Sequence, residues 1–305
     1  CSDILKRYLK YLGYKVKHVM NITDVDDKTI RDSQKEGISL KEFTKRYEKA
    51  FFEDLKSLNV LPADIYPRAT DYIDEMVEIT QALLDKGIAY KGEDGSVYYN
   101  IRKFKSYGKL ANINLNKLKT GASGRVKKDE YEKDNVQDFA LWKHHDKADG
   151  DIVWDTQVGY GRPGWHVECS AMAIKNLGKT FDIHCGGIDL IFPHHQNEIA
   201  QSEGYTGKKF VNYWLHNEWL LVNGQKMSKS LGNFYTLRDV LGKGCSPSAV
   251  RYLLLSTHYR QQLNFTFEGI DAAKASVERL NELTRKLQDV KESSKRSVLI
   301  KKEIV

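Results

Sequence analysis

The order of a helical segment, a strand-like segment and a polar turn is the feature of this sequence that most limits its fold. Residues 2–12 carry apolar side chains at helical spacing, and Gly13 follows them as a stop signal. Residues 14–20 alternate lysines with β-prone side chains and end in a polar turn at residues 21–24. This order is typical of α/β proteins.

Two further helices and a later return of short apolar runs extend the pattern. The capping sequence Ser39–Glu42 predicts a helix over residues 40–58, where aromatic and leucine side chains recur at helical spacing. Another helix is predicted over residues 70–86, with Gly87 as its stop. Apolar runs and glycines return over residues 152–204. We therefore predict an α/β fold whose two parts are separated by an insertion.

The insertion is basic. Residues 88–99 predict a β-hairpin, and residues 101–128 contain nine Lys or Arg and no Asp or Glu, although the whole chain has a net charge of only +7. A solvated insertion and a nucleic-acid surface both remain open for such a run. Phe104 and Tyr107 interleave with the basic residues, which favours stacking on bases combined with phosphate contacts.

Composition excludes several classes of protein. Apolar residues make up 41% and charged residues 29%, which excludes a disordered tail, a collagen-like fibre and a disulfide-stapled miniprotein. No apolar run approaches the roughly 20 residues that cross a bilayer, so we expect no membrane partner. The four cysteines show no CxxC spacing, which favours a reducing, cytoplasmic location. Because the first residue is Cys1 and not Met, we expect a fragment of a longer chain.

A short loop rich in lysine and serine is the first candidate site. Residues 226–230 read Lys-Met-Ser-Lys-Ser and lie between Gly224 and Gly232. Ammonium groups can neutralise a polyphosphate, while hydroxyls and backbone N–H groups fix its geometry. A basic surface loop is the alternative, but a match of this length arises by chance in about one chain in 10⁴.

A cysteine, a histidine and a glutamate form the second candidate site. His194 and Glu198 are four residues apart directly after Pro193, a spacing that places both side chains on one face of a helix. A thiolate from Cys169 could join them in a mixed sulfur, nitrogen and oxygen site for zinc. On spacing alone, a surface His–Glu pair and a core cysteine remain open as alternatives.

Four stretches of the sequence resemble motifs of the cysteinyl-tRNA synthetases and follow one another in the order found in that family. The similarity extends to about Leu287. The Lys-Met-Ser-Lys-Ser loop followed by Leu-Gly-Asn resembles the ATP signature of class I aminoacyl-tRNA synthetases. The resemblance implies a Rossmann-type parallel-sheet nucleotide-binding catalytic domain with a connective insertion, followed by an α-helical C-terminal region. The four stretches are residues 21–28, 161–172, 192–198 and 226–233.

The resemblance also implies a division of the chain, with ligands at the carboxyl ends of the parallel strands. The expected segments are a first part of the catalytic domain at residues 1–87, the connective insertion at 88–158, a second part of the catalytic domain at 159–210, a stem-contact segment with the KMSKS loop at 211–265, and the start of a helical domain at 266–305.

Individual residues receive roles from the same resemblance. Cys169, His194 and Glu198 correspond to three of four ligands of one zinc ion per chain, the fourth being a cysteine upstream of the residues shown. Lys229 is expected to be the main catalytic phosphate contact, ahead of Lys226. The expected ATP-binding residues are Lys226, Met227, Ser228, Lys229 and Ser230, and the expected substrate-binding residues are Thr23, Trp165, His184 and Asp189, the last as the partner of the α-ammonium group.

The implied activity is the two-step charging of tRNA(Cys). L-cysteine attacks the α-phosphate of ATP to give cysteinyl-adenylate and pyrophosphate, and the 3′-terminal ribose of the tRNA then takes the acyl group. Mg²⁺ is expected with ATP, the tRNA acceptor end is expected on the basic insertion, and the protein is expected to be a monomer. Zinc accepts a substrate thiolate far better than a serine hydroxyl, so no editing site is needed.

The match departs from the family pattern at several positions. The HIGH motif expected before the first helix, and the fourth zinc ligand with it, are not in the sequence shown, and Cys1 is not assigned to the metal. Cys185 and Glu218 stand where the family usually has glycine. Two alternatives therefore stay open: a cysteine ligase of the mycothiol-pathway type that acts on an amino-sugar, and a non-catalytic RNA-binding relic of a synthetase.

Overall fold

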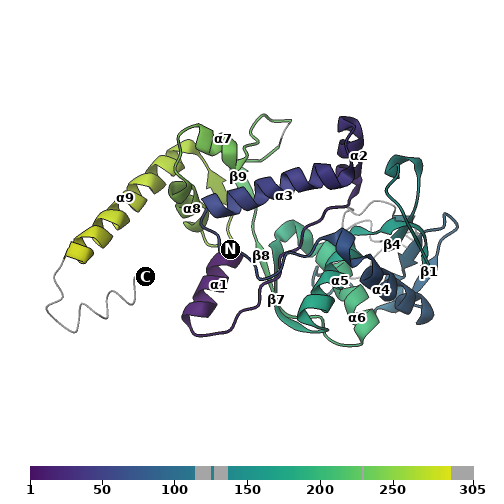
Figure 1. The fold of residues 1–305 in the computed structure, drawn as a ribbon. Coiled ribbons are helices and arrows are strands. Elements are labelled where there is room, and N and C mark those ends of the chain that lie inside the picture. Colours follow the sequence, from purple (N-terminus) through teal and green to yellow (C-terminus); the bar gives the residue numbers. More distant parts are fainter. Residues whose placement is uncertain (114–124, 127–136, 229, 290–305) are drawn as a thin grey trace. The chain divides into compact units, whose positions relative to one another are not determined.

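The computed structural model describes residues 1–113, 125–126, 137–228 and 230–289 of the chain (Figure 1). Lys229 and residues 114–124 and 127–128 of the basic run fall outside these residues. The chain divides into two compact units, Cys1–Glu218 and Trp219–Val305. Among the described residues, no helix combines the length and the apolar character that crossing a bilayer requires.

Three helices open the first unit, and the second and third begin at capping signals in the sequence. At the start of the second helix, the side chain of Asp26 accepts a hydrogen bond from the backbone N–H of Thr29 at 2.6 Å. At the start of the third, Ser39 Oγ accepts from the N–H of Glu42 at 3.2 Å, as the capping sequence predicts. The helices are α1 (Ser2–Tyr11), α2 (Asp27–Glu36) and α3 (Leu40–Ser57).

Helix α1 buries two charged side chains and leaves part of its apolar face exposed. Asp3 accepts a hydrogen bond from the backbone N–H of Leu61 at 2.8 Å, and Lys6 donates to the carbonyl of Pro62 at 2.7 Å. Both charged residues are buried, whereas Tyr8 on the apolar face is 57% exposed. Polar contacts to a neighbouring segment therefore decide which face of α1 turns inward.

The strand predicted over residues 14–20 is reduced to two isolated parallel bridges, Val19–Ile65 and Ile22–Arg68. Pro67 lies between the two partner positions, and its carbonyl accepts from the N–H of Ile22 at 2.8 Å. Proline has no N–H to donate to the opposite strand, so the ladder of backbone hydrogen bonds is interrupted there. The predicted extent of this strand is therefore wrong.

The next two predicted elements are confirmed. Helix α4 (Ile73–Asp85) follows a 3₁₀ turn at Ala69–Tyr72, and Gly87 after it has φ +65°. Strands β1 (Ala89–Lys91) and β2 (Val97–Tyr99) then pair antiparallel as a hairpin. Gly95 in the connecting turn has φ +81°, a conformation that glycine adopts without strain.

The hairpin belongs to a larger sheet with strand order β1-β2-β4-β6-β5. Aromatic side chains of its strands, among them Tyr99, Phe139 and Trp142, are fully buried and form much of the core of the first unit. The remaining strands are β3 (Arg125–Val126), which pairs with β4 in parallel, β4 (Asp138–His144), β5 (Trp154–Thr156) and β6 (Gly159–Pro163).

The described start of the basic run, residues 101–113, has two different faces. Tyr107 and Ala111 lie in the core, Phe104 packs against it, and Tyr107 is only 4% exposed. The prediction that the ring of Tyr107 stacks on bases is therefore wrong. The cationic side chains of the same segment are exposed, namely Arg102, Lys103, Lys105 and Lys109.

A parallel β-α-β arrangement completes the first unit. Strand β7 (Phe181–Gly187) pairs in parallel with β8 (Val211–Asn217), and helix α6 (His194–Thr206) forms the crossover between them. Helix α5 (Trp165–Leu177) precedes β7 and lies beside α6 (Figure 1). The carboxyl end of β7 leads through a short 3₁₀ turn into the first turn of α6, which is where ligands bind in such folds.

The second unit begins with a tight hairpin of β9 (Leu220–Val222) and β10 (Gln225–Lys226). Its two turn residues, Asn223 and Gly224, have φ +51° and +75°, as the favoured two-residue hairpin turn requires. Strand β11 (Leu263–Phe265) pairs with β9 in parallel. The helices of this unit are α7 (Leu237–Gly242), α8 (Pro247–Leu255) and α9 (Phe267–Asp289).

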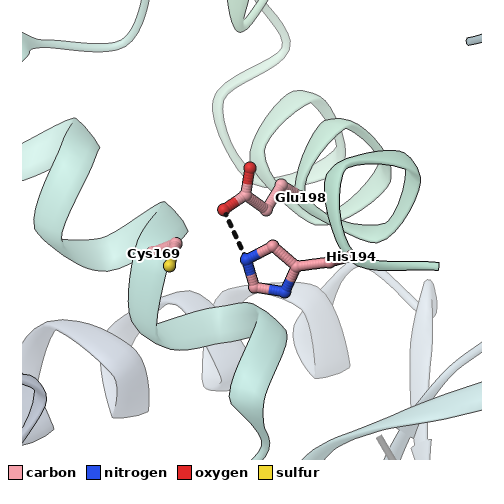
Figure 2. A group of neighbouring side chains, drawn as sticks. All are labelled: Cys169, His194 and Glu198. Carbon is pink, nitrogen blue, oxygen red and sulfur yellow. Dashed lines mark ion pairs between the residues drawn. The ribbon is translucent and has the colours of Figure 1, made fainter. Parts of the chain in front are cut away.

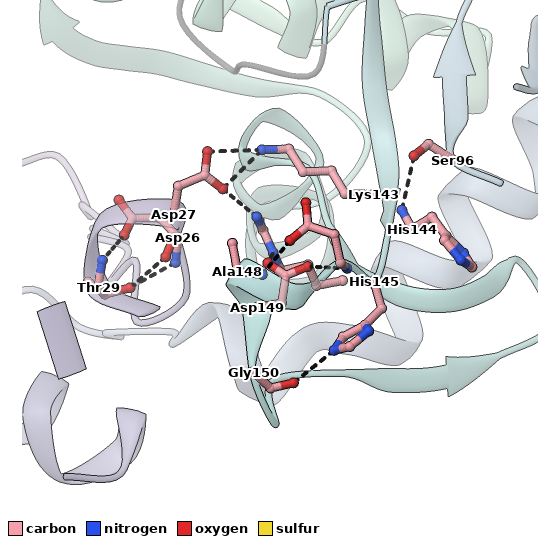
Figure 3. Close-up of polar contacts among 12 residues, drawn as sticks. Asp26, Asp27, Thr29, Ser96, Lys143, His144, His145, Ala148, Asp149 and Gly150 are labelled. Atoms are coloured by element: carbon pink, nitrogen blue, oxygen red, sulfur yellow. Dashed lines mark hydrogen bonds and ion pairs between the residues drawn. The ribbon is translucent and has the colours of Figure 1, made fainter. Parts of the chain in front are cut away.

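A buried arginine joins α2 to the sheet, beside the contact between Lys143 and Asp27 that is drawn in Figure 3. The Nε of Arg162 in β6 donates to Asp149 at 2.6 Å, and its Nη2 pairs with Asp27 at the start of α2. Lys143 Nζ lies 3.3 Å from Asp27 Oδ1. Burial alone would raise the pKa of Asp27, but Lys143 and Arg162 hold it below its ordinary value. The stabilisation that the ionised Asp27 gains from Lys143 and Arg162 is present above about pH 3.8. It is lost as the pH falls through the lowered pKa of Asp27.

We expect Arg162→Met to lower the free energy of unfolding by about 3–5 kcal/mol, because it leaves the buried carboxylate of Asp149 without its cation. Arg46→Met is the control, since Arg46 pairs with Glu36 at the surface and should contribute little. Urea unfolding followed by circular dichroism measures both variants. Equal losses would contradict this assignment of the buried pair.

Candidate functional site

Helices α5 and α6 bring together the three predicted metal-binding side chains (Figure 2). The sulfur of Cys169, a ring nitrogen of His194 and a carboxylate oxygen of Glu198 all lie within 4.8 Å of one another. His194 and Glu198 are one helical turn apart and are 4% and 0% exposed. Cys169 faces them from α5 and is partly exposed.

The ring of His194 is held on two sides by residues of α5. Its Nδ1 lies 2.9 Å from Nδ1 of His166, which is fully buried. Trp165 stacks on the same ring, with centroids 4.2 Å apart and planes at 29°. When Nδ1 of His194 donates to His166, the lone pair of its Nε2 is directed toward Glu198 and is available to a ligand.

The two carboxylate oxygens of Glu198 face different histidines. Its Oε2 is bonded to Nε2 of His184 at 2.7 Å. Its Oε1 is 3.2 Å from Nε2 of His194, but it meets the geometry of a hydrogen bond with no residue that the structure describes. Burial would raise the pKa of Glu198, yet His184 and His194 hold it well below its ordinary value.

The thiol of Cys169 lies in an environment that keeps it protonated. Burial raises its pKa well above the ordinary value, and the negative charges of Glu198 and Glu168 raise it further. The amide Nδ2 of Asn21 lies 3.6 Å from the sulfur and 3.4 Å from the hydroxyl of Thr23. The predicted substrate residue Thr23 is thus connected to the cluster through Asn21.

The donor atoms of the cluster suit a metal ion. Sulfur, imidazole nitrogen and carboxylate oxygen are the ligands that zinc binds in proteins. The buried Oε1 of Glu198 lacks a hydrogen-bond donor among the described residues, so a cation there would satisfy it. Coordination would also remove the proton from the thiol of Cys169.

The predicted substrate residues His184 and Asp189 lie in β7 and in the turn that follows it. His184 and His195 form a second group with Glu198 whose ligand atoms lie within 4.8 Å. Nδ1 of His195 is bonded to Nε2 of His216 at 2.8 Å, and burial lowers the pKa of His195 to about 2, so the ring is neutral. Asp189 lies in the 3₁₀ turn that follows β7 and is exposed.

Cys185 is separated from this group by the geometry of the strand. It is the neighbour of His184 in β7, and successive side chains of a strand point to opposite faces. Burial raises the pKa of its thiol. At the next position, a Cβ on Gly186 would lie 2.5 Å from the ring of His195, so the close approach of β7 to α6 depends on a glycine there.

The KMSKS loop of the second unit is held by one asparagine. Asn233 Oδ1 accepts from the N–H of Ser228 at 2.8 Å, and its Nδ2 donates to the carbonyl of Lys226 at 3.1 Å. The hydroxyls of Ser228 and Ser230 are 2.6 Å apart. The ammonium of Lys226 lies 5.0 Å from the centre of the Trp219 ring. Lys229 lies outside the described residues.

Sequence reasoning missed three of these residues, His166, Asn21 and Asn233. A signal for His166 was available, because it precedes Cys169 by three residues and so lies on the same helix face. Asn21 and Asn233 belong to the motifs that were recognised, but nothing in their spacing predicts which atoms they bond.

The chain is similar in sequence and in fold to known proteins. A family model described as "tRNA synthetases class I (C) catalytic domain" matches residues 1–275. The chain belongs to this family. Among its curated relatives are proteins named cysteine–tRNA ligase from Protochlamydia amoebophila, 57% identical over 290 residues, and from Brachyspira hyodysenteriae, 56% identical over 289 residues. Each match covers 95% of this chain. The chain in turn spans 61% of the length of each of these relatives.

The fold of this class I chain is also found in a solved structure. Mycobacterium tuberculosis methionyl-tRNA synthetase in complex with methionyl-adenylate superimposes with a TM-score of 0.66 at 16% sequence identity, covering 88% of this chain and 62% of that chain. The predicted Rossmann-type α/β fold class is confirmed by this likeness and by the family match.

The start of α5 depends on Gly164, whose added Cβ would lie 2.1 Å from the carbonyl oxygen of Ala140. We expect Gly164→Ala to lower the free energy of unfolding by about 1–3 kcal/mol, because either β4 or α5 must move. Gly242→Ala is the matched control, since a Cβ on Gly242 meets nothing within 4 Å. Thermal melting compares the two, and an equal effect would contradict the predicted clash.

Proposed function

We propose that the chain is the catalytic portion of a cysteine–tRNA ligase, which activates L-cysteine with ATP and transfers it to tRNA(Cys). The observation that carries the proposal is that the ligand atoms of Cys169, His194 and Glu198 lie within 4.8 Å of one another. Membership of the class I synthetase family and the name shared by the relatives at 56–57% identity support it.

Cys169, His194 and Glu198 would hold one zinc ion. Zinc would act as a soft Lewis acid that accepts the thiolate of cysteine as a further ligand. It binds the hydroxyl of serine much more weakly, so serine would be rejected. The protein prepares these side chains: His166 and Trp165 fix the ring of His194, and His184 holds one oxygen of Glu198 so that the other is free for the metal.

The remaining pocket residues would orient the amino acid. Trp165 covers the ring of His194 and can close over the substrate side chain. Thr23 is tied to the cluster by Asn21, so its hydroxyl can bond the substrate near the metal. The exposed carboxylate of Asp189, at the carboxyl end of β7, can pair with the α-ammonium group.

The KMSKS loop would bind ATP with Mg²⁺. Ammonium and hydroxyl groups for the phosphates come from Lys226, Lys229, Ser228 and Ser230, and Met227 completes the loop between them.

In the first step the carboxylate oxygen of cysteine bonds to the α-phosphorus of ATP and pyrophosphate leaves. In the second, a 3′-terminal ribose hydroxyl of the tRNA bonds to the cysteinyl carbonyl and AMP leaves. Positioning and charge stabilisation suffice, without a protein nucleophile.

The acceptor end of the tRNA would lie on the basic insertion, and the protein would act as a cytoplasmic monomer. The five segments predicted from the sequence remain the proposed division of the chain. The two alternatives, an amino-sugar ligase and a non-catalytic relic, have no support in the names of the relatives.

We expect the full-length protein to transfer labelled cysteine to total tRNA in the presence of ATP, Mg²⁺ and zinc. Acid-precipitable label that disappears on RNase treatment is the predicted result. If cysteine drives ATP–pyrophosphate exchange but no RNA is charged, the adenylate is used elsewhere and the amino-sugar ligase replaces this proposal.

We expect Cys169→Ser to reduce bound zinc from about one ion per chain to nearly none, because a serine hydroxyl is a poor ligand for zinc. Cys245→Ser is the control, since Cys245 lies in the second unit and is also partly exposed. Metal analysis of the dialysed full-length variants checks the prediction. Unchanged zinc in Cys169→Ser would remove this residue from the ligand set.

A further inference from the structure

Residues 101–113, named here the cationic segment, are bonded to helix α6 by a buried tyrosine. The phenol of Tyr107 donates to Asn197 Oδ1 at 2.5 Å. Tyr107 is 4% exposed and Asn197 is fully buried, so no water replaces this bond easily. Loss of a buried hydrogen bond costs free energy on both partners.

A second contact fixes the far end of the same segment. Gln196 Oε1 accepts from the backbone N–H of Leu110 at 3.1 Å and of Ala111 at 3.4 Å. The chain turns sharply before these residues: Gly108 has φ +88°, and a Cβ there would lie 2.5 Å from the carbonyl oxygen of Ile113. The backbone of the segment is therefore held in one shape against α6.

The residues that receive these bonds lie between two of the candidate metal ligands. His194 and Glu198 flank Gln196 and Asn197 in the first turns of α6. Successive residues of a helix are rotated by about 100°, so Gln196 and Asn197 leave the helix in other directions than His194 and Glu198, which share one face. One rigid stretch of helix thus contacts the metal cluster on one side and the cationic segment on another.

The outer face of the segment fits an RNA backbone. It carries no acidic residue, and its four cationic side chains are exposed. None of the four has an ion-pair partner among the residues that the structure describes. Exposed lysines and arginines of this density bind phosphates and release counterions. The four are Arg102, Lys103, Lys105 and Lys109.

We propose that Tyr107, Gln196 and Asn197 are positioning residues that fix the cationic segment to α6 and so hold the 3′ end of a bound tRNA at a set distance from the amino-acid site. The inference rests on the proposed function. A phosphate backbone bound to an unattached segment would move independently of His194 and Glu198, and acyl transfer is sensitive to displacements of about 1 Å.

The test uses Tyr107→Phe in the full-length protein, which keeps the ring in the core and removes only the hydroxyl. We expect kcat/KM for tRNA to fall about three- to tenfold, the range of one hydrogen bond. The dependence of kcat/KM on salt should become weaker as phosphate contacts are lost. Cysteine-dependent ATP–pyrophosphate exchange, which needs no tRNA, should stay at the wild-type rate.

Tyr99→Phe is the matched control. Tyr99 comes from β2, outside the cationic segment, and its phenol also donates to α6, at the carbonyl of Ala200, at 2.8 Å. It is as buried as Tyr107. The same chemical change on the same helix should therefore leave kcat/KM for tRNA unchanged.

Gln196→Leu tests the second contact, because it removes the oxygen that accepts from the N–H groups of Leu110 and Ala111. We expect transfer to tRNA to be lost in part and exchange to stay at the wild-type rate. Unchanged transfer would contradict the role of the acceptor oxygen.

The outcomes separate the two proposals. If Tyr107→Phe leaves transfer within twofold of wild type, matches Tyr99→Phe, or slows exchange as much as transfer, the positioning role is overturned. A wild-type protein that charges no tRNA overturns the proposed function instead.

Discussion

The carboxylate of Glu198 has no solvent exposure, and the arrangement of the first unit follows from the need to keep its charge paired. Removing a carboxylate from water is costly unless hydrogen bonds and opposite charges replace its hydration. His184 from β7 bonds one oxygen, while the other faces His194 and the sulfur of Cys169. Strand β7 and helix α6 cannot shift against one another without separating this charge from His184.

The two candidate sites are built in different ways. The cluster at α5 and α6 rests on secondary structure and on glycines such as Gly164 and Gly186, where the backbone passes too close to a neighbour for any side chain. The KMSKS loop instead rests on the side chain of Asn233. A loop held by a few hydrogen bonds changes shape at less cost than a packed helix, which would suit the ATP-binding role proposed for it.

Local signals in the sequence predicted the elements that depend on local chemistry. The helix behind Ser39 and the hairpin at residues 88–99 have the predicted form because capping residues and turn glycines act within a few positions. Predictions that depended on distant partners were less accurate. The strand at residues 14–20 is interrupted by Pro67 on the opposite segment, and α1 buries Asp3 because Leu61 offers a backbone donor.

In the candidate site, too, the features set by local sequence were predicted and those set by distant partners were not. The helical spacing of His194 and Glu198 was sufficient to place both on one face, and Cys169 joined them through the recognised motif. The bond between His166 and His194 joins two helices, and no local pattern specifies the register between them. The core position of Tyr107 was hidden for the same reason, since a ring among lysines gives no sign of which side it packs on.

Helix α6 is buried at its start, yet the buried residues there are polar, from His194 through Glu198. Such a helix gains little apolar burial of its own and, at this length, is marginal in isolation. Its first turns become stable only when α5, β7 and the cationic segment supply their bonding partners. A substitution that removes one of these partners should therefore loosen the first turns of α6, where the candidate ligands lie, while the aromatic core of the first unit stays packed.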